Sequence, residues 1–145
     1  MNKFKILVID DEVSIHELIS DAISATKYGK KIDMISAMDG EEGINCLKYQ
    51  PVDFCILDLK LPKMNGLEVL KAVEESSIRC DFVMMSGHTT VEQAIEALKL
   101  GALDFFVKPV EYPELKSLVE QAYEHHQIEN QKIRIKPPAL SSLVG

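Results

Sequence analysis

The sequence predicts an α/β fold: a doubly wound parallel sheet of five strands with five helices on its two faces. Short apolar runs, each suited to one buried strand, alternate five times with segments whose apolar residues recur at helical spacing. The segments that join these units are short, and loops of about 2–6 residues are typical of parallel sheets covered by helices. The chain of 145 residues is long enough for one domain with a substantial core.

Two strand–helix units are expected in the first fifty residues. The apolar runs Phe4–Ile9 and Lys31–Ala37 fit strands. The second helix is expected after a turn at Asp39-Gly40, with Ile44 and Leu47 on its apolar side. The first helix has apolar residues at helical spacing at Ile15, Leu18, Ile19 and Ala22.

A central strand ends on a carboxylate. The apolar run from Val52 to Leu57 fits a strand buried on both faces, and Asp58 follows it directly. Pro62 and Asn65-Gly66 then force a turn, because proline lacks an amide donor and glycine permits positive φ. The helix after this turn has one face made of Gly66, Val69, Leu70 and Val73. Asp58 is thus expected at the carboxyl end of a strand, where open α/β sheets bind ligands.

The last two strands also lead into polar residues. The run Cys80–Met85 is followed by Ser86, and the run Leu103–Val107 is followed by Lys108. Gly101 is expected to end the helix between them, because glycine is common just after a helix C-terminus. The fourth and fifth helices are expected to face the core through Val91, Ala94, Ile95 and Leu98 and through Leu115, Leu118, Val119 and Ala122, respectively.

Acids, a hydroxyl and an amine follow four of the five predicted strands. They are Asp10, Asp11, Asp58, Ser86 and Lys108. Parallel strands bring their carboxyl ends to one edge of a sheet, so these side chains are expected to lie close together. Two carboxylates about 5 Å apart repel each other by roughly 3 kcal/mol at an effective dielectric constant of about 20. A hard divalent cation would remove that cost, and oxygen-only ligands favour Mg²⁺.

The same residues could hold a phosphoryl group. Mg²⁺ would neutralise an incoming phosphate, Lys108 would contact the phosphoryl oxygens, and the Ser86 hydroxyl would hydrogen-bond one of them. Asp58 would then be the nucleophile and form an aspartyl phosphate. A structural role, in which Asp11 or Glu12 caps the first helix, stays open for the acids after the first strand.

With these residues in this order, the chain resembles a response-regulator receiver domain of bacterial two-component signalling over about residues 3–125. The resemblance implies a flavodoxin-like sheet with strand order 2-1-3-4-5 and a sensor histidine kinase that supplies the phosphoryl group to Asp58. It implies that Mg²⁺ is held by Asp11, Asp58 and the backbone carbonyl of Lys60, with Asp10 acting mostly through water. Such a domain is not an enzyme toward other molecules, because it catalyses only its own phosphorylation and dephosphorylation.

Three more positions follow from the resemblance. Phe105, three residues before the lysine, matches the rotating aromatic that acts as a switch together with Ser86, where many receivers have tyrosine. Lys60 and His88, two residues beyond the phosphoacceptor and the hydroxyl residue, match positions that tune the loss of phosphate. A packed aromatic at position 105 and solvated loop side chains at the other two positions are the alternative interpretations.

Two other classes of protein share parts of this pattern. A flavodoxin has the same topology, but it binds the phosphate of FMN in a loop rich in Ser, Thr and Gly after its first strand. Here that loop is Asp10-Asp11-Glu12, which repels phosphate unless a metal intervenes, and the chain has no tryptophan to stack on a flavin. An aspartyl-nucleophile phosphatase usually has a second aspartate two residues after the nucleophile, where this chain has Lys60.

Composition favours a cytoplasmic protein. The net charge of −7 argues against direct nucleic-acid binding by this chain. No run approaches the roughly 18 apolar residues of a membrane span, so no membrane contact is expected, and the N-terminus lacks a signal-peptide layout. Three cysteines, an odd number without metal-type spacing, suit a reducing compartment.

Residues 1–125 are expected to form the receiver domain, and residues 126–145 a helical extension and linker. The fifth helix is expected to continue over Glu114–Arg134, and Pro137-Pro138 would end it. The run SGHTTVEQAIEALKLGALDFF resembles receivers of the NtrC type, which precede a sigma-54-dependent ATPase domain. Control of an output domain for transcription is therefore expected, and a stand-alone receiver that acts by protein–protein contact is the alternative.

The fourth helix, fifth strand and fifth helix form the face next to the predicted site, so phosphorylation is expected to reshape that face. Mixed charges on a surface permit a self-complementary contact, and a homodimer through this face is expected. An ordinary solvated surface is the alternative. The charged residues concerned are Glu92, Glu96, Lys99, Glu111, Lys116 and Glu120.

Overall fold

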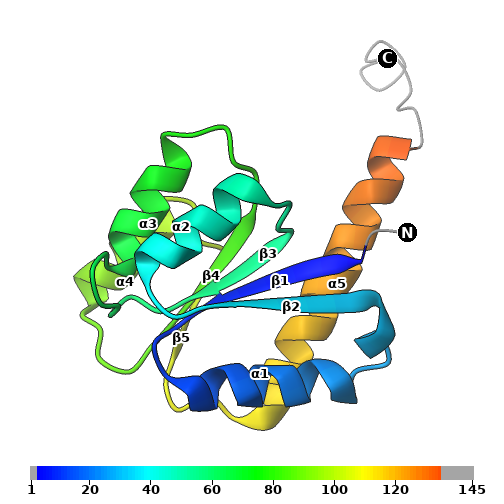
Figure 1. The fold of residues 1–145 in the computed structure, drawn as a ribbon. Coiled ribbons are helices and arrows are strands. Elements are labelled where there is room, and N and C mark those ends of the chain that lie inside the picture. Colours follow the sequence, from blue (N-terminus) through cyan, green and yellow to red (C-terminus); the bar gives the residue numbers. More distant parts are fainter. Residues whose placement is uncertain (1–2, 135–145) are drawn as a thin grey trace, which may run out of the picture.

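One five-stranded sheet forms the centre of the computed structural model, which describes residues 3–134 and side chains through residue 131. Its elements in chain order are β1 (Phe4–Ile9), α1 (Val13–Ala25), a 3₁₀ turn (Gly29–Lys31), β2 (Ile32–Ala37), α2 (Gly40–Tyr49), β3 (Phe54–Leu57), α3 (Gly66–Glu74), β4 (Asp81–Ser86), α4 (Val91–Lys99), β5 (Asp104–Val107) and α5 (Tyr112–Arg134). The strand order β2-β1-β3-β4-β5 and the parallel pairing of every neighbour confirm the predicted fold. Helices α1 and α5 cover one face of the sheet, and α2, α3 and α4 cover the other (Figure 1).

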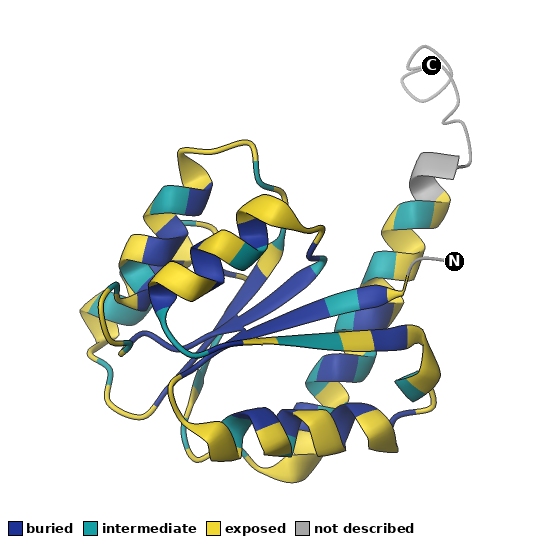
Figure 2. Cartoon of the chain, in the orientation of Figure 1, coloured by how far each residue is buried: buried dark blue, intermediate teal, exposed yellow. Residues whose placement is uncertain are grey.

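The two faces of the sheet bury separate apolar cores. Successive side chains of a strand point to opposite faces, so the central strands serve both cores at once. Figure 2 shows the central strands almost wholly buried, whereas the outer sides of the helices are exposed. The side chains toward α2, α3 and α4 include Leu7, Ile9, Cys55 and Leu57. Those toward α1 and α5 include Ile6, Val8, Phe54 and Ile56.

The predicted strands agree with the observed strands to within two residues at each end. Helix caps fix where α2 and α3 begin, because the side chains of Asp39 and Asn65 accept the backbone N–H groups of Glu42 and Glu68. The predicted core face of α3 is confirmed, since its buried residues are Gly66, Val69, Leu70 and Val73.

The predicted core face of α4 is wrong. Val91, Ile95 and Leu98 are 75, 46 and 47% exposed. The buried residue of this helix is Ala97, and Ala94 is half-buried. The helix packs on α3 and on the edge strand β5, and its small residues allow the close approach. The helical spacing of the apolar residues was right, but spacing alone does not reveal which stripe of a helix faces the sheet.

Helix α1 is turned slightly from its predicted orientation. Ile15 and Leu18 are half-buried rather than buried. A polar side chain, His16, enters the interior instead, and nothing in the apolar pattern indicated it. The buried residues of α1 are His16, Ile19, Ala22 and Ile23.

Helix α5 extends to Arg134, which confirms the predicted long helix. Leu115 and Val119 are buried as predicted, and Tyr123 is buried as well. The Tyr123 ring stacks on Tyr28 at 4.3 Å between centroids, and Tyr28 in turn donates a hydrogen bond to Glu124. The expected linker lies outside the described residues. Between residues 3 and 134, no helix is long and apolar enough to cross a membrane.

The orientation of α4 predicts a contrast between two isoleucines. Ile95→Ala is expected to change the free energy of unfolding by less than about 1 kcal/mol, because nearly half of this surface residue is already exposed to solvent. Ile19→Ala in α1 is expected to cost about 2–5 kcal/mol, because it leaves a cavity in the core. Chemical denaturation of both variants measures the two costs. Equal costs would contradict the exposure of the α4 apolar stripe.

Candidate functional site

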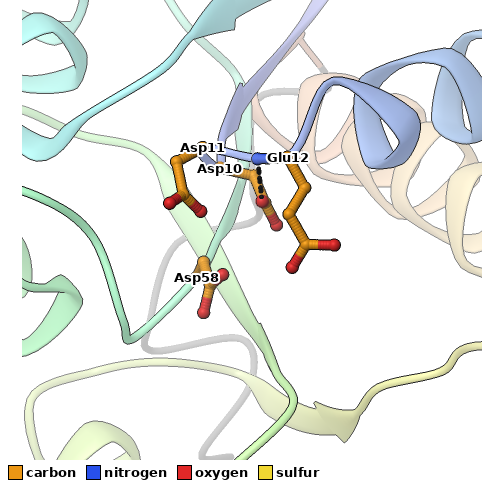
Figure 3. Close-up of side chains that lie close together, drawn as sticks. All are labelled: Asp10, Asp11, Glu12 and Asp58. Carbon is orange, nitrogen blue, oxygen red and sulfur yellow. Dashed lines mark hydrogen bonds between the residues drawn. The ribbon is translucent and has the colours of Figure 1, made fainter.

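Four carboxylates gather at the carboxyl ends of β1 and β3 (Figure 3). Asp10, Asp11 and Glu12 follow β1, and Asp58 follows β3. One oxygen of each lies within 4.8 Å of the others. Asp10 and Asp58 are only 2% and 4% exposed, whereas Asp11 and Glu12 are exposed. The structure thus brings together the three acids named from the sequence and adds a fourth.

Lys108 neutralises part of this charge. Its side chain reaches from the end of β5 across the sheet edge, and Nζ lies 2.8 Å from Asp10 Oδ2 and 3.0 Å from Asp58 Oδ2 and Glu12 Oε1. Burial alone would lower the pKa of Lys108, but the hydrogen bonds to Asp10, Asp58 and Glu12 raise that pKa above its usual value. The amine therefore stays charged and pairs with three acids at once.

The direction of the Asp58 carboxylate is fixed by the loop that follows it. Its Oδ1 accepts the N–H of Lys60 at 3.0 Å, while Oδ2 faces Lys108. Gly66 at the start of α3 lies against the Asp58 backbone, because a Cβ there would be 2.4 Å from the Asp58 carbonyl oxygen. Only glycine permits this approach. The N–H of Gly66 also donates to the carbonyl of Leu59 at 2.8 Å, which closes the loop.

The buried position of Asp10 disfavours the ionised form of its carboxyl group. Burial raises the pKa of Asp10 above its usual value, and the hydrogen bonds from Lys108 and from the Glu12 N–H oppose that rise without cancelling it. The Glu12 N–H donates to Asp10 Oδ1 at 2.8 Å. The folded chain thus tolerates the ionised Asp10 only because cationic and N–H groups lie next to it.

A side-chain capping bond from Glu12 to α1 is contradicted. Glu12 occupies the N-cap position, but within the described chain its side chain makes no capping hydrogen bond. Its carboxylate bonds the Lys108 ammonium instead, at 3.0 Å. Glu12 was therefore missed as a site residue, although its place directly after Asp10-Asp11 was a usable signal.

Ser86 ends β4 with a buried hydroxyl. The residue is 0% exposed, and its Oγ has no hydrogen-bond partner among the residues that the structure describes. Buried hydroxyls are normally paired, so a ligand oxygen would satisfy this one. Phe105, the register partner of Met84 in β4, is half-buried. Lys60 and His88 are exposed.

A cleft of about 490 Å³ opens beside the acids. With all groups ionised, four carboxylates and one ammonium carry a charge of 1 − 4 = −3. The side-chain donors are all oxygen, the ligand type that hard divalent cations prefer, so the residues present fit such a cation. The cleft is lined by Asp11, Leu59, Lys60, Leu61, Pro62, Asn65, Leu67 and Gln93.

Comparisons with known proteins agree with one another. The family described as "Response regulator receiver domain" matches residues 6–120. The response regulator protein PilR of Pseudomonas aeruginosa is 30% identical over 154 residues, which cover 100% of this chain and 34% of PilR. The signal receiver domain assigned to a Luxo repressor protein of Vibrio parahaemolyticus superposes with a TM-score of 0.80 at 25% identity, covering 89% of this chain and 96% of that one.

A second solved structure, NtrX from Brucella abortus, has a TM-score of 0.75 at 26% identity and covers 95% of this chain. The match covers 31% of that NtrX chain. These relatives bear out the predicted resemblance to regulators of the NtrC type. The chain spans 34, 48 and 31% of the length of three curated relatives that it matches.

The burial of Asp10 predicts a pH dependence of stability. A carboxyl group whose pKa rises on folding stabilises the fold below its unfolded pKa, and this contribution is lost as the pH rises through the folded pKa. In metal-free buffer, Asp10→Asn is therefore expected to be more stable than the wild type at neutral pH. The difference should shrink as the pH falls toward the ordinary value of 3.8. Thermal unfolding across this range measures it, and a wild type that is the more stable protein at neutral pH would contradict the assignment.

Proposed function

The chain belongs to the response regulator receiver domain family, and from this premise we propose that it takes a phosphoryl group from a sensor histidine kinase onto Asp58 with Mg²⁺ as its cofactor. The observation that carries the proposal is the Lys108 ammonium bound to three carboxylates, one of them Asp58. An amine in this position neutralises the acceptor before transfer and can bind phosphoryl oxygens afterwards.

In the proposed transfer, a carboxylate oxygen of Asp58 attacks the phosphorus of a phosphohistidine on the kinase. The new O–P bond forms as the P–N bond breaks, and the electron pair of the broken bond stays on the imidazole nitrogen. Lys108 then donates to the phosphoryl oxygens. The unpartnered hydroxyl of Ser86 donates to another of them. The domain acts on no other substrate, because it catalyses only its own phosphorylation and dephosphorylation.

The residues proposed to hold Mg²⁺ are Asp11, Asp58 and the backbone carbonyl of Lys60, with Asp10 acting mostly through water. The cation would supply positive charge against the developing charge on the phosphoryl oxygens. Glu12 extends this acidic set, and its bond to Lys108 keeps the ammonium close to the acceptor.

We assign control of the lifetime of the phosphoryl group to Lys60 and His88. Both side chains are exposed at the edge of the site, two residues beyond Asp58 and Ser86. From there they can admit or exclude the water that hydrolyses the aspartyl phosphate.

The proposed switch couples Ser86 to Phe105. A phosphoryl group adds a charge of about −1.5 to −2 and new acceptor oxygens. Ser86 gains a hydrogen-bond partner by moving toward Asp58, and the space it leaves admits the half-buried Phe105 ring. Phenylalanine has no hydroxyl, so this switch works by packing alone.

The α4-β5-α5 face is the proposed output surface. Mixed charges and exposed apolar side chains lie on it together, which suits a homodimer. This chain spans about a third of the length of PilR. We therefore propose that it is the receiver part of a longer cytoplasmic protein, in which it controls an output domain for transcription. A stand-alone receiver is the alternative. The exposed apolar residues are Val91, Ile95, Leu98, Leu103 and Val107.

Labelling tests the phosphoacceptor. With Mg²⁺ and a small phosphodonor, the intact mass is expected to rise by one phosphoryl group. Asp58→Asn should abolish the rise, because an amide is not a nucleophile of this kind, and a chelator should abolish it in the wild type. Asp33→Asn, which changes an exposed acid of β2, is the matched control and should be labelled normally. Labelling of Asp58→Asn, or labelling indifferent to the chelator, would contradict the proposal.

Fluorine NMR tests the switch. With 4-fluorophenylalanine incorporated, the resonance assigned to Phe105 is expected to shift when the wild type is phosphorylated. Phosphorylated Ser86→Ala should show little of that shift. Without the hydroxyl, the coupling of about 1–3 kcal/mol between the phosphoryl group and the Phe105 ring is lost. Ser14→Ala, an exposed serine in α1, is the control. The same shift in labelled Ser86→Ala and wild type would rule out this route.

Sedimentation tests the dimer. Labelled full-length chain is expected to associate more strongly than unlabelled chain, and removal of the end of α5 should weaken the association. Because Tyr123 and His126 both pack on Phe4, the truncation is placed after His126 to keep the core intact. If labelled and unlabelled samples of both lengths sediment alike, a dimer that depends on phosphorylation is excluded.

A further inference from the structure

His16 joins α1 to the acidic turn after β1. The residue is 7% exposed, its Nε2 lies 2.7 Å from the backbone oxygen of Asp10, and its Nδ1 lies 2.9 Å from Ser36 Oγ. A carbonyl oxygen only accepts hydrogen bonds, so Nε2 carries a proton and donates it. The neutral Nε2–H tautomer and the imidazolium both make this bond, so the contact does not depend on the charge of the ring.

Each of three consecutive peptide groups of the turn is held by at least one hydrogen bond, and the carbonyl of the first, Ile9, also accepts the N–H of Asp58 at 2.9 Å. The N–H of Asp10 donates to the carbonyl of Ala37 at 3.1 Å, and the N–H of Glu12 donates to Asp10 Oδ1 at 2.8 Å. Between them lies the peptide that joins Asp10 to Asp11, and its carbonyl accepts the bond from His16. This middle peptide sets the relative direction of the two aspartates, and the contact from α1 holds it.

We propose that His16 is a positioning residue for the divalent cation site, acting through the Asp10 carbonyl. This inference rests on the proposed function, because it requires that the acids bind a cation. Groups that orient metal ligands from behind typically contribute about 10–100-fold to metal affinity. Helix α1 thus prepares the site through a side chain that does not touch the cation.

The test compares two amides at position 16. In His16→Gln, the amide nitrogen can reach the place of Nε2 and donate to the Asp10 carbonyl. In His16→Asn, the shorter side chain reaches only the place of Nδ1, beside Ser36. Calorimetric titration of the unphosphorylated proteins with MgCl₂ is expected to show at least about tenfold weaker binding for the Asn variant and binding within about threefold of wild type for the Gln variant.

Ile19→Ala is the matched control for damage to α1. It removes a fully buried side chain of the same helix and should lower stability without changing Mg²⁺ affinity at a temperature where the protein is folded. Circular dichroism checks folding, and His16→Met, which has no donor to offer the Asp10 carbonyl, replaces the Asn variant if that one does not fold.

Two results would overturn the positioning role of His16 but leave the proposed function intact. A folded Asn or Met variant that binds Mg²⁺ as tightly as the wild type would show that the bond is not needed. A Gln variant as weak as the Asn variant would show that ring shape, and not the hydrogen bond, matters. A wild type that binds no Mg²⁺ would overturn this role and the proposed function together.

Discussion

A single ammonium group pairs with three carboxylates at the carboxyl edge of the sheet, and the arrangement of the site depends on it. Lys108 lies within 3.0 Å of oxygens from Asp10, Glu12 and Asp58. Asp10 and Asp58 are buried, so removal of Lys108 would leave buried carboxylates without their cation, a change that typically costs about 3–5 kcal/mol. Because β5 and β1 are not neighbours in the sheet, the contact also joins the ends of strands that share no backbone hydrogen bonds.

The same contact connects the end of β5 to Asp58. A phosphoryl group on Asp58 would compete for the Lys108 ammonium, and Lys108 directly follows this four-residue edge strand. The strand is only partly buried, and such regions open or shift at lower free energy than the central strands. Phe105 on the same strand and the exposed apolar residues of α4 beside it therefore lie where a local change in charge can alter the surface.

The sequence was sufficient for the parts of the site that follow from the sheet. Short apolar runs that alternate with helical segments have few alternative placements, so the ends of β1, β3, β4 and β5 and the polar residues after them could be located. The buried side of α4 could not, because an edge strand leaves little surface for a helix to cover and an alanine makes the contact. Glu12 and His16 were missed for a different reason. Glu12 had a signal in its place directly after Asp10-Asp11, but its bond to Lys108 and the bond of His16 to the Asp10 carbonyl depend on side-chain directions that no local pattern records.

The central claim is that the acids around Asp58 form one divalent cation site, and Mn²⁺ tests it most directly. Mn²⁺ accepts the same oxygen ligands as Mg²⁺, and its unpaired electrons broaden nearby NMR signals. Amide signals of residues 10–12 and 58–60 are expected to broaden first, and excess Mg²⁺ should restore them. Signals of Asp53 and His126, an acid and an imidazole 3.8 Å apart away from the site, serve as the internal control. Broadening at Asp53 and His126 before residues 10–12, or no broadening at residues 10–12 and 58–60, would contradict the account.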